Sequence, residues 1–166
     1  MKLKNLTRCG LLTAVMAVCA WVAIPVGELA VTMQTFALFL ILSLLGGRRG
    51  SIVCLVYLLL GAVGLPVFTG FQGGIGILLG PTGGYLWGFL AAALIYWALE
   101  GRVPRLFCLI LGLFGCYICG TLWHFLVWSE GGLWLILLKC VLPYLLPDGL
   151  KLALALVCVR RLEKIA

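Results

Sequence analysis

One uncharged stretch, LFCLILGLFGCYICGTLWHFLV at residues 106–127, decides the kind of fold that this chain adopts. A helix of about 20 apolar residues crosses the hydrocarbon core of a bilayer. The whole chain has the same character, because 64% of its residues are hydrophobic and 10% are charged, with a mean hydropathy of +1.24. Soluble domains carry roughly 25% charged residues. The sequence therefore predicts an integral membrane protein and excludes a soluble enzyme and a nucleic-acid-binding protein.

Outward from this stretch, apolar segments alternate with polar or glycine-rich breaks. The predicted helices cover residues 6–24, 33–45, 51–63, 85–99, 106–127 and 148–159. The second and third are short for full spans, so we expect them to extend into flanking residues or to lie where the protein is thin. The apolar piece at 133–142 is too short to span and is expected to be a half-helix or an interfacial segment on the outer face. The pattern predicts an all-α bundle of six transmembrane helices in one domain, residues 1–166.

Basic residues set the expected orientation of the bundle. The net charge is +7, and of the 12 Lys and Arg residues all but Lys139 and Lys151 lie before or in the first turn of the first helix, in the breaks at 46–50 and 100–105, or in the C-terminal tail. Short basic loops are typical of the cytoplasmic side. With six spans, both termini are expected in the cytoplasm. The same basic surface is compatible with binding anionic membrane lipid.

Three irregular stretches then fall on the outer side, at residues 25–32, 64–84 and 129–147. Non-helical backbone at membrane depth is tolerated only where it is buried in protein or lines a cavity. We therefore expect a ligand site that opens to the outer face. The aromatic residues of this side also fit an interfacial belt; they are Trp123, Trp128, Trp134 and Tyr144.

Asp148 and Lys151 are the clearest polar candidates. They stand three residues apart at the start of the last predicted helix, so they share one face. Ionisable groups within a membrane segment mark functional sites by default. A carboxylate accepts N–H donors and an ammonium donates to oxygen, which suits the binding of a polar ligand. The alternative is an Asp helix cap with a local ion pair.

Two further polar sets accompany this pair. Thr32 and Gln34 begin the second predicted helix, where a buried Gln either contacts a ligand or bonds a neighbouring helix. The stretch GGIGILLGPTGGY at 73–85 adds Thr82, Gly83 and Tyr85. Its glycines allow close backbone approach to a ligand or serve helix packing alone. It lacks the Gly-Lys-Ser/Thr of a nucleotide-binding loop.

Catalytic and metal chemistry have little support. His124 is the single histidine and lies among aromatic residues, which favours an interfacial position. Cys116 and Cys119 form a CxxC inside an apolar run without a second such motif, so small apolar cysteines in helix contacts are the better interpretation. We therefore expect no enzyme activity, no metal and no cofactor. An integral membrane enzyme is the weakest of the hypotheses considered.

Four segments together resemble the BioY family, the biotin-specific S components of energy-coupling factor (ECF) transporters. They occur in the same order as in that family and are VTMQTF (31–36), LLGAVGLPVF (59–68), GGIGILLGPTGGYLWGF (73–89) and LPYLLPDGLKLALA (142–155). The resemblance implies a six-helix bundle with cytoplasmic termini that binds biotin with high affinity for uptake across the bacterial plasma membrane. A transmembrane coupling subunit and two ATPases would drive transport.

The resemblance also implies roles for particular residues. In the family, an Asp and a Lys of the last helix contact biotin, and they correspond here to Asp148 and Lys151. An Asn contributes in at least one member, whereas the single Asn of this chain is Asn5, near the N-terminus. Gln34, Gln72 or a backbone group is then the candidate for that contact.

Small residues pattern the first predicted helix on two faces. Cys9, Thr13 and Ala17 repeat at four-residue spacing, as do Gly10 and Ala14. Such faces let another helix approach closely, either from the coupling subunit or from the same chain. Besides biotin uptake, the sequence leaves open an S component for another vitamin and a membrane scaffold subunit without a ligand.

Overall fold

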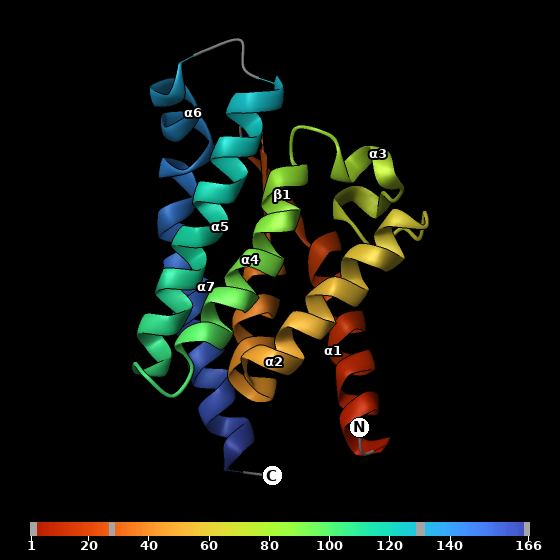
Figure 1. The fold of residues 1–166 in the computed structure, drawn as a ribbon, viewed down its shortest axis with the longest axis vertical. Coiled ribbons are helices and arrows are strands. Elements are labelled where there is room, and N and C mark those ends of the chain that lie inside the picture. The colour runs from red at the N-terminus through yellow and green to blue at the C-terminus, as the bar shows by residue number, and fades with distance from the viewer. Residues whose placement is uncertain (1–2, 27–28, 129–131, 165–166) are drawn as a thin grey trace.

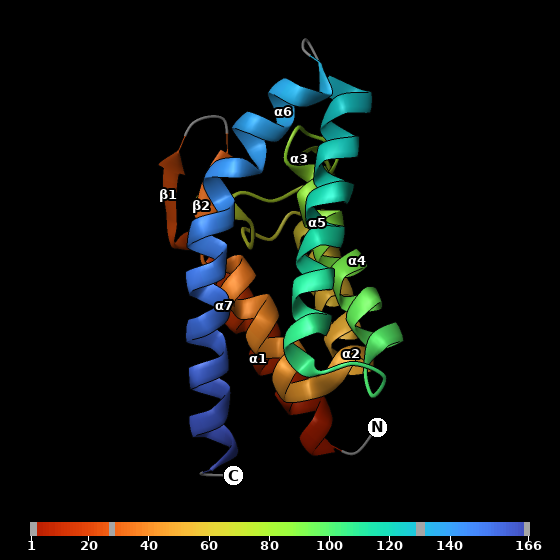
Figure 2. The ribbon, with the colours of Figure 1, turned by 90° about the vertical axis from the view of Figure 1, so that its left-hand side faces the viewer.

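The structure is a computed structural model that describes residues 3–26, 29–128 and 132–164. It is a helical bundle whose two ends differ (Figures 1 and 2). The elements in chain order are α1 (Leu3–Trp21), β1 (Ala23–Val26), β2 (Leu29–Thr32), α2 (Gln34–Ala62), the 3₁₀ turn η1 (Thr69–Phe71), α3 (Ile75–Leu78), α4 (Gly83–Leu99), α5 (Arg105–Trp128), α6 (Leu133–Cys140) and α7 (Leu142–Glu163).

The apolar helices confirm an all-α membrane protein as the fold class. Within the described residues, four helices are long and apolar enough to cross a membrane: residues 3–21, 34–62, 105–127 and 136–163. Helix α4 is apolar but shorter. Both ends of the chain lie at the end of the bundle that also carries the α4–α5 connection, and the β-hairpin, α3 and α6 lie at the other (Figures 1 and 2).

Helix α2 joins the two helices predicted at 33–45 and 51–63. Its backbone leaves helical geometry at Gly46, where φ is 76° and ψ is 171°. A glycine adopts this left-handed region without the steric cost that a side chain would bring. After the bend the chain folds back on itself. Gly50 therefore lies so close to Leu42 that an added Cβ would be 2.6 Å from Leu42 Cδ2. Glu100, at the end of α4, holds the bend by accepting a 2.9 Å hydrogen bond from the Gly47 N–H.

The stretch 25–32, expected to be irregular, contains paired strands. Strands β1 and β2 are antiparallel, with Ala23 opposite Thr32 and Pro25 opposite Ala30. Their β-branched residues favour extended backbone, and proline is tolerated on an edge strand because it cannot donate to a ladder. The pairing satisfies backbone groups that an irregular loop would leave without partners.

The last helix begins earlier than its predicted start at residue 148. Helix α7 starts at Leu142 and contains both prolines of the segment PYLLPD. Pro143 lies in the first turn, where its missing N–H is not needed, and Pro147 is accommodated inside the helix. The segment between α6 and α7 is therefore a short junction at Val141 instead of a long break.

The first helix separates its two small-residue faces. Cys9, Thr13 and Ala17 are buried, and Cys9 and Ala17 belong to the apolar core. This face therefore packs within the chain and is not a free docking surface. Gly10 and Ala14 lie on the exposed side of α1.

We predict that Gly47→Ala destabilises the fold at the α2 bend. A Cβ at this position would overlap the backbone of Trp97, so α2 and α4 would have to separate. Overpacking of this kind costs about 1–3 kcal/mol, and thermal unfolding in detergent measures it. Gly10→Ala is the matched control, since no described heavy atom lies within 4 Å of its Cβ. A melting temperature of Gly47→Ala equal to that of the parent would contradict this packing.

Candidate ligand-binding site

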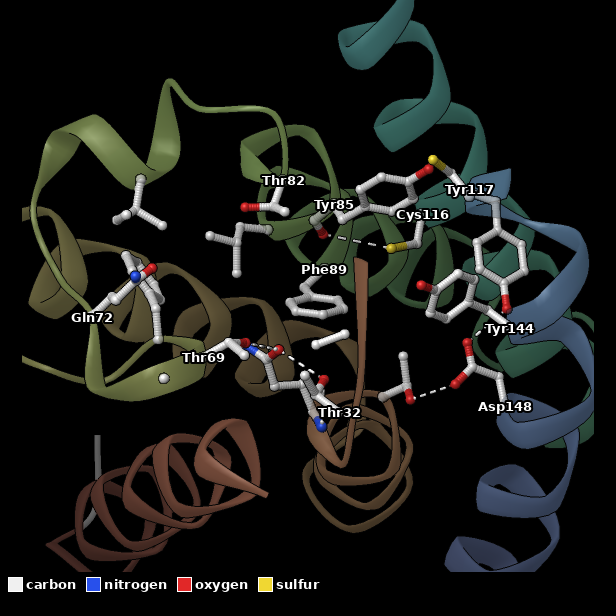
Figure 3. Close-up of a pocket in the computed structure, with 18 of the residues that line it drawn as sticks. Thr32, Thr69, Gln72, Thr82, Tyr85, Phe89, Cys116, Tyr117, Tyr144 and Asp148 are labelled. Carbon is white, nitrogen blue, oxygen red and sulfur yellow. Dashed lines mark hydrogen bonds between the residues drawn. The ribbon is translucent and has the colours of Figure 1, made fainter. Parts of the chain in front are cut away.

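A cavity of about 360 Å³ lies at the hairpin end of the bundle, between α2, α4, α5 and α7 (Figure 3). Its size falls within the range of small-molecule sites. The residues that line it come from almost every element of the fold: Ala30, Thr32, Gln34, Thr35, Phe68, Thr69, Gly70, Gln72, Ile77, Thr82, Tyr85, Leu86, Phe89, Cys116, Tyr117, Cys140, Tyr144, Asp148 and Lys151. A ligand in this cavity would contact segments that are far apart in the sequence.

The structure brings six of the predicted site residues to this one cavity. They are Thr32, Gln34, Thr82, Tyr85, Asp148 and Lys151. Gly83 is instead buried behind the wall, where a Cβ would overlap the Leu78 carbonyl. Its role is close approach between α3 and α4. Gln72, the other candidate for the amide contact, also lines the cavity.

Asp148 and Lys151 form a buried ion pair on α7. Their side chains line the cavity and are 5% and 9% exposed, and Lys151 Nζ lies 2.7 Å from Asp148 Oδ1. A buried charge is costly unless it is paired and hydrogen-bonded. The pairing therefore lets two ionisable groups remain inside an apolar bundle.

Neighbouring helices complete the bonds of this pair. The Thr35 hydroxyl donates to Asp148 Oδ1 at 2.8 Å and accepts from Lys151 Nζ at 3.2 Å. The Tyr117 hydroxyl donates to Asp148 Oδ2 at 2.6 Å (Figure 3). The carboxylate thus joins α2, α5 and α7. Because α7 begins at Leu142, Asp148 lies inside the helix, so it does not cap the N-terminus.

A second, neutral polar cluster surrounds Gln34. Its Oε1 accepts from the hydroxyls of Thr32 at 2.9 Å and Thr69 at 3.3 Å. Its Nε2 donates to the Tyr57 hydroxyl at 2.7 Å, which in turn donates to the Val67 carbonyl at 2.9 Å. Gln34 therefore connects β2 and the loop after α2 to the start of the helix. The bonds fix the amide with its oxygen towards the two threonines.

The remaining wall of the cavity is apolar and aromatic. Phe68 and Phe89 are buried, and the Tyr85 and Tyr144 rings stand near Tyr117 (Figure 3). Cys116 lies in this wall, with its thiol 3.6 Å from the Tyr85 carbonyl. Cys119, its partner in the CxxC, is not a lining residue. Within the described ranges, no three His, Cys, Asp or Glu side chains gather as metal ligands do.

Several site residues were not predicted from the sequence. Thr35 follows Gln34 directly, and Tyr117 lies inside the apolar run of α5, where its hydroxyl was the available signal. Polar groups in membrane helices usually seek a partner on another helix, and Tyr117 finds Asp148. Phe68 and Thr69 belong to the stretch 64–84, which was predicted only to be irregular and to lie on the outer side.

Fold and site together define a membrane protein with a cavity whose size and partly polar lining suit a small molecule. Comparison with known proteins identifies the family to which the chain belongs. The family model described as "BioY family" matches residues 1–166, and the chain belongs to this family.

Individual relatives agree with the family match. A probable biotin transporter BioY of Pyrococcus horikoshii is 35% identical over 165 residues, which cover 98% of each protein. The biotin transporter BioY2 of Lactococcus lactis subsp. cremoris is 42% identical over 127 residues, 74% of this chain and 70% of that protein. The biotin transporter BioY of Thermotoga maritima is 45% identical, but the alignment spans 56% of this chain and 55% of the relative.

A solved structure has the same fold. It is the crystal structure at 2.1 Å of the S-component for biotin from an ECF-type ABC transporter. The TM-score is 0.87 at 30% sequence identity, and the match covers 98% of this chain and 92% of the other. The bundle with its bent second helix is therefore the fold of an S component.

We predict that the Asp148–Lys151 pair contributes to stability only as a unit. Lys151→Met leaves Asp148 buried without its countercharge, at a cost of about 3–5 kcal/mol in unfolding free energy. Adding Asp148→Asn to Lys151→Met should restore part of the loss. Thermal unfolding without added ligand measures both effects.

The exposed ion pair between Arg105 and Glu163, at 3.0 Å, provides the control. Glu163→Gln should cost less than about 1 kcal/mol, because solvent screens this pair. An equal and small loss in Lys151→Met and Glu163→Gln would show that the buried pair is not structurally coupled.

Proposed function

We propose that this chain binds biotin as the substrate-binding subunit of an ECF transporter and serves biotin uptake. The observation that carries the proposal is the hydrogen-bonding capacity left at the buried Asp148–Lys151 pair. A carboxylate offers about four lone-pair sites and an ammonium three donors. The described side chains occupy two sites on Oδ1 and one on Oδ2, and Lys151 donates to Asp148 and Thr35.

Among the described side chains, one acceptor site of Asp148, on Oδ2, and one donor of Lys151 thus remain for a ligand. The ureido ring of biotin presents an N–H next to a carbonyl, which is the complementary pattern. Its thioether ring suits the apolar wall around Phe68 and Phe89. A membrane scaffold without a ligand would have no use for a buried charge pair that faces a cavity.

The other polar part of the ligand is proposed to lie at the exposed side of the cavity, beyond the neutral cluster around Gln34. Thr32, Gln34, Thr69 and Gln72 are neutral, while Asp148 and Lys151 already balance each other. The carboxylate of biotin would find no countercharge deep in such a cavity. We therefore place it towards the exposed side chains of Gln72 and Thr82, where water can solvate it.

The proposed membrane arrangement has six crossings with both termini in the cytoplasm. It counts α1, the two arms of α2, α4, α5 and α7 as crossings. The basic breaks of the chain and both termini then share the cytoplasmic side, and the cavity opens outward. A transmembrane coupling subunit and two ATPases are the proposed energy source, with the exposed Gly10–Ala14 face of α1 as the candidate contact.

Biotin titration of the purified protein tests the proposed ligand. We expect Asp148→Ala and Lys151→Ala each to weaken binding by roughly 10- to 100-fold, since a hydrogen bond to a charged group contributes about 1.5–3 kcal/mol. Isothermal titration measures the affinities, and Glu163→Gln should bind like the parent. Failure of the well-folded parent to bind biotin would overturn the proposal and direct the search to another vitamin.

The same titration with 2-iminobiotin tests the role of Lys151 separately. This analogue carries a guanidine in place of the urea; at neutral pH the guanidine is protonated, so the group that replaces the carbonyl can only donate hydrogen bonds and is repelled by the Lys151 ammonium. We expect the parent to bind biotin more tightly than the analogue by about tenfold or more, which corresponds to the loss of one hydrogen bond to a charged group. Lys151→Met should lose most of this preference. An unchanged preference in that variant would move the carbonyl contact elsewhere.

Labelling with a membrane-impermeant maleimide tests the orientation. We expect Gln72→Cys to react in intact cells and Arg102→Cys to react only after permeabilisation, because the positive-inside rule places the basic breaks in the cytoplasm. The parent, with its eight cysteines, gives the background. Strong labelling of Arg102→Cys in intact cells would contradict the six-span arrangement.

A further inference from the structure

One wall of the cavity is a short chain segment that a side chain of α1 holds at both ends. Residues 66–71, here called the wall segment, include Phe68, Thr69 and Gly70, which line the cavity. The Trp21 indole N–H donates to the Pro66 carbonyl at 2.9 Å. The ring of Trp21 also stacks on Phe71, with centroids 4.7 Å apart and 27° between the planes.

The inner side of the wall segment is fixed by the bundle itself. The Phe68 ring occupies a notch at Gly61, where a Cβ would overlap it. The Tyr57 hydroxyl donates to the Val67 carbonyl at 2.9 Å, and the Phe68 N–H donates to the Gln72 carbonyl at 2.9 Å. These contacts position the lining side chains, whereas Trp21 contacts the two ends of the segment.

Phe71 has a backbone conformation that requires support. Its φ is 58°, in the left-handed region that non-glycine residues adopt rarely. Its side chain is 63% exposed, so burial in the bundle does not hold it there. Strained residues persist when their surroundings determine them, and the ring of Trp21 stacks on this side chain.

We propose that Trp21 is a positioning residue that keeps the wall segment closed over a bound ligand. Release of the ligand then requires the Trp21–Pro66 hydrogen bond and the Trp21–Phe71 stack to break along with the inner contacts of Val67 and Phe68, after which the segment can move away from the cavity. The inference rests on the proposed function for its ligand, biotin. It assigns to α1 a role in ligand retention, although Trp21 itself does not line the cavity.

Dissociation kinetics of biotin from three variants test this proposal. Trp21→Leu removes both contacts, and the dissociation rate should rise about tenfold, the combined effect of one hydrogen bond and one aromatic stack. Trp21→Phe keeps a ring but removes the N–H, so a smaller, few-fold rise is expected. Trp87→Leu on α4 is the matched control, because Trp87 is 37% exposed against 38% for Trp21 and lies outside the cavity lining.

The association rate separates retention from a damaged pocket. Retention predicts faster dissociation with an association rate that is not lowered. An unchanged dissociation rate in Trp21→Leu, or a lowered association rate alone, would overturn the proposal. Should Trp21→Leu fail to fold, Phe71→Leu removes the same stack from the other side and is expected to speed dissociation likewise; an unchanged rate there overturns the proposal as well.

Amide hydrogen exchange without ligand keeps this proposal distinct from the biotin assignment. The Phe68 N–H, bonded to Gln72, should exchange faster in Trp21→Leu than in the parent and in Trp87→Leu. A parent that fails to bind biotin would overturn the proposed ligand and leave the exchange result to decide the role of Trp21. Equal exchange in all three proteins would refute that role.

Discussion

The buried ion pair of Asp148 and Lys151 is the constraint on which the rest of the site depends. An apolar bundle cannot solvate either charge, so each requires the other and further hydrogen-bonding partners. Thr35 and Tyr117 supply these partners from α2 and α5. The pair therefore fixes where three helices meet, and the cavity forms beside that meeting point. Neutrality of the pair also makes the site suitable for an uncharged polar group.

The non-helical segments at the hairpin end follow a related rule. Backbone groups at membrane depth must find partners within the protein, and the pairing of β1 with β2 does this for residues 23–26 and 29–32. Downstream, Tyr57 bonds Val67 and Gly61 receives the Phe68 ring. Gln34 connects both regions through Thr32 and Thr69. The loops are thus tied to the bundle by a few specific contacts.

Much of this arrangement was predictable from the sequence, because hydropathy locates apolar helices, and polar or ionisable residues stand out within them or at their ends. Asp148, Lys151, Gln34 and Thr32 were found in this way, and they lie at the cavity. Tyr117 was not, since an apolar run does not reveal which face of a helix meets a partner. The faces of α1 show the same limit. Cys9 and Gly10 each belong to a series of small residues at four-residue spacing, yet Cys9 is buried and Gly10 is exposed.

The early start of α7 was unpredictable for a different reason. Proline usually marks a helix end, but Pro143 occupies a first turn that does not need its N–H. A break at this point would have put Asp148 at a helix start, where a capping role competes with ligand binding. Because the helix begins at Leu142, the N–H groups of that first turn lie well before Asp148. The carboxylate is left to interact with Lys151, Thr35 and Tyr117.

Recognition and access are divided between two kinds of structure in this protein. The charged pair and its partners stand on α2, α5 and α7, whose backbones are held by regular hydrogen bonds and buried packing. The covering wall comes from β2 and residues 66–71, which are fixed by a small number of contacts. Segments with few buried contacts open at lower free energy than the core does. The wall can therefore move while the polar groups that select the ligand keep their geometry.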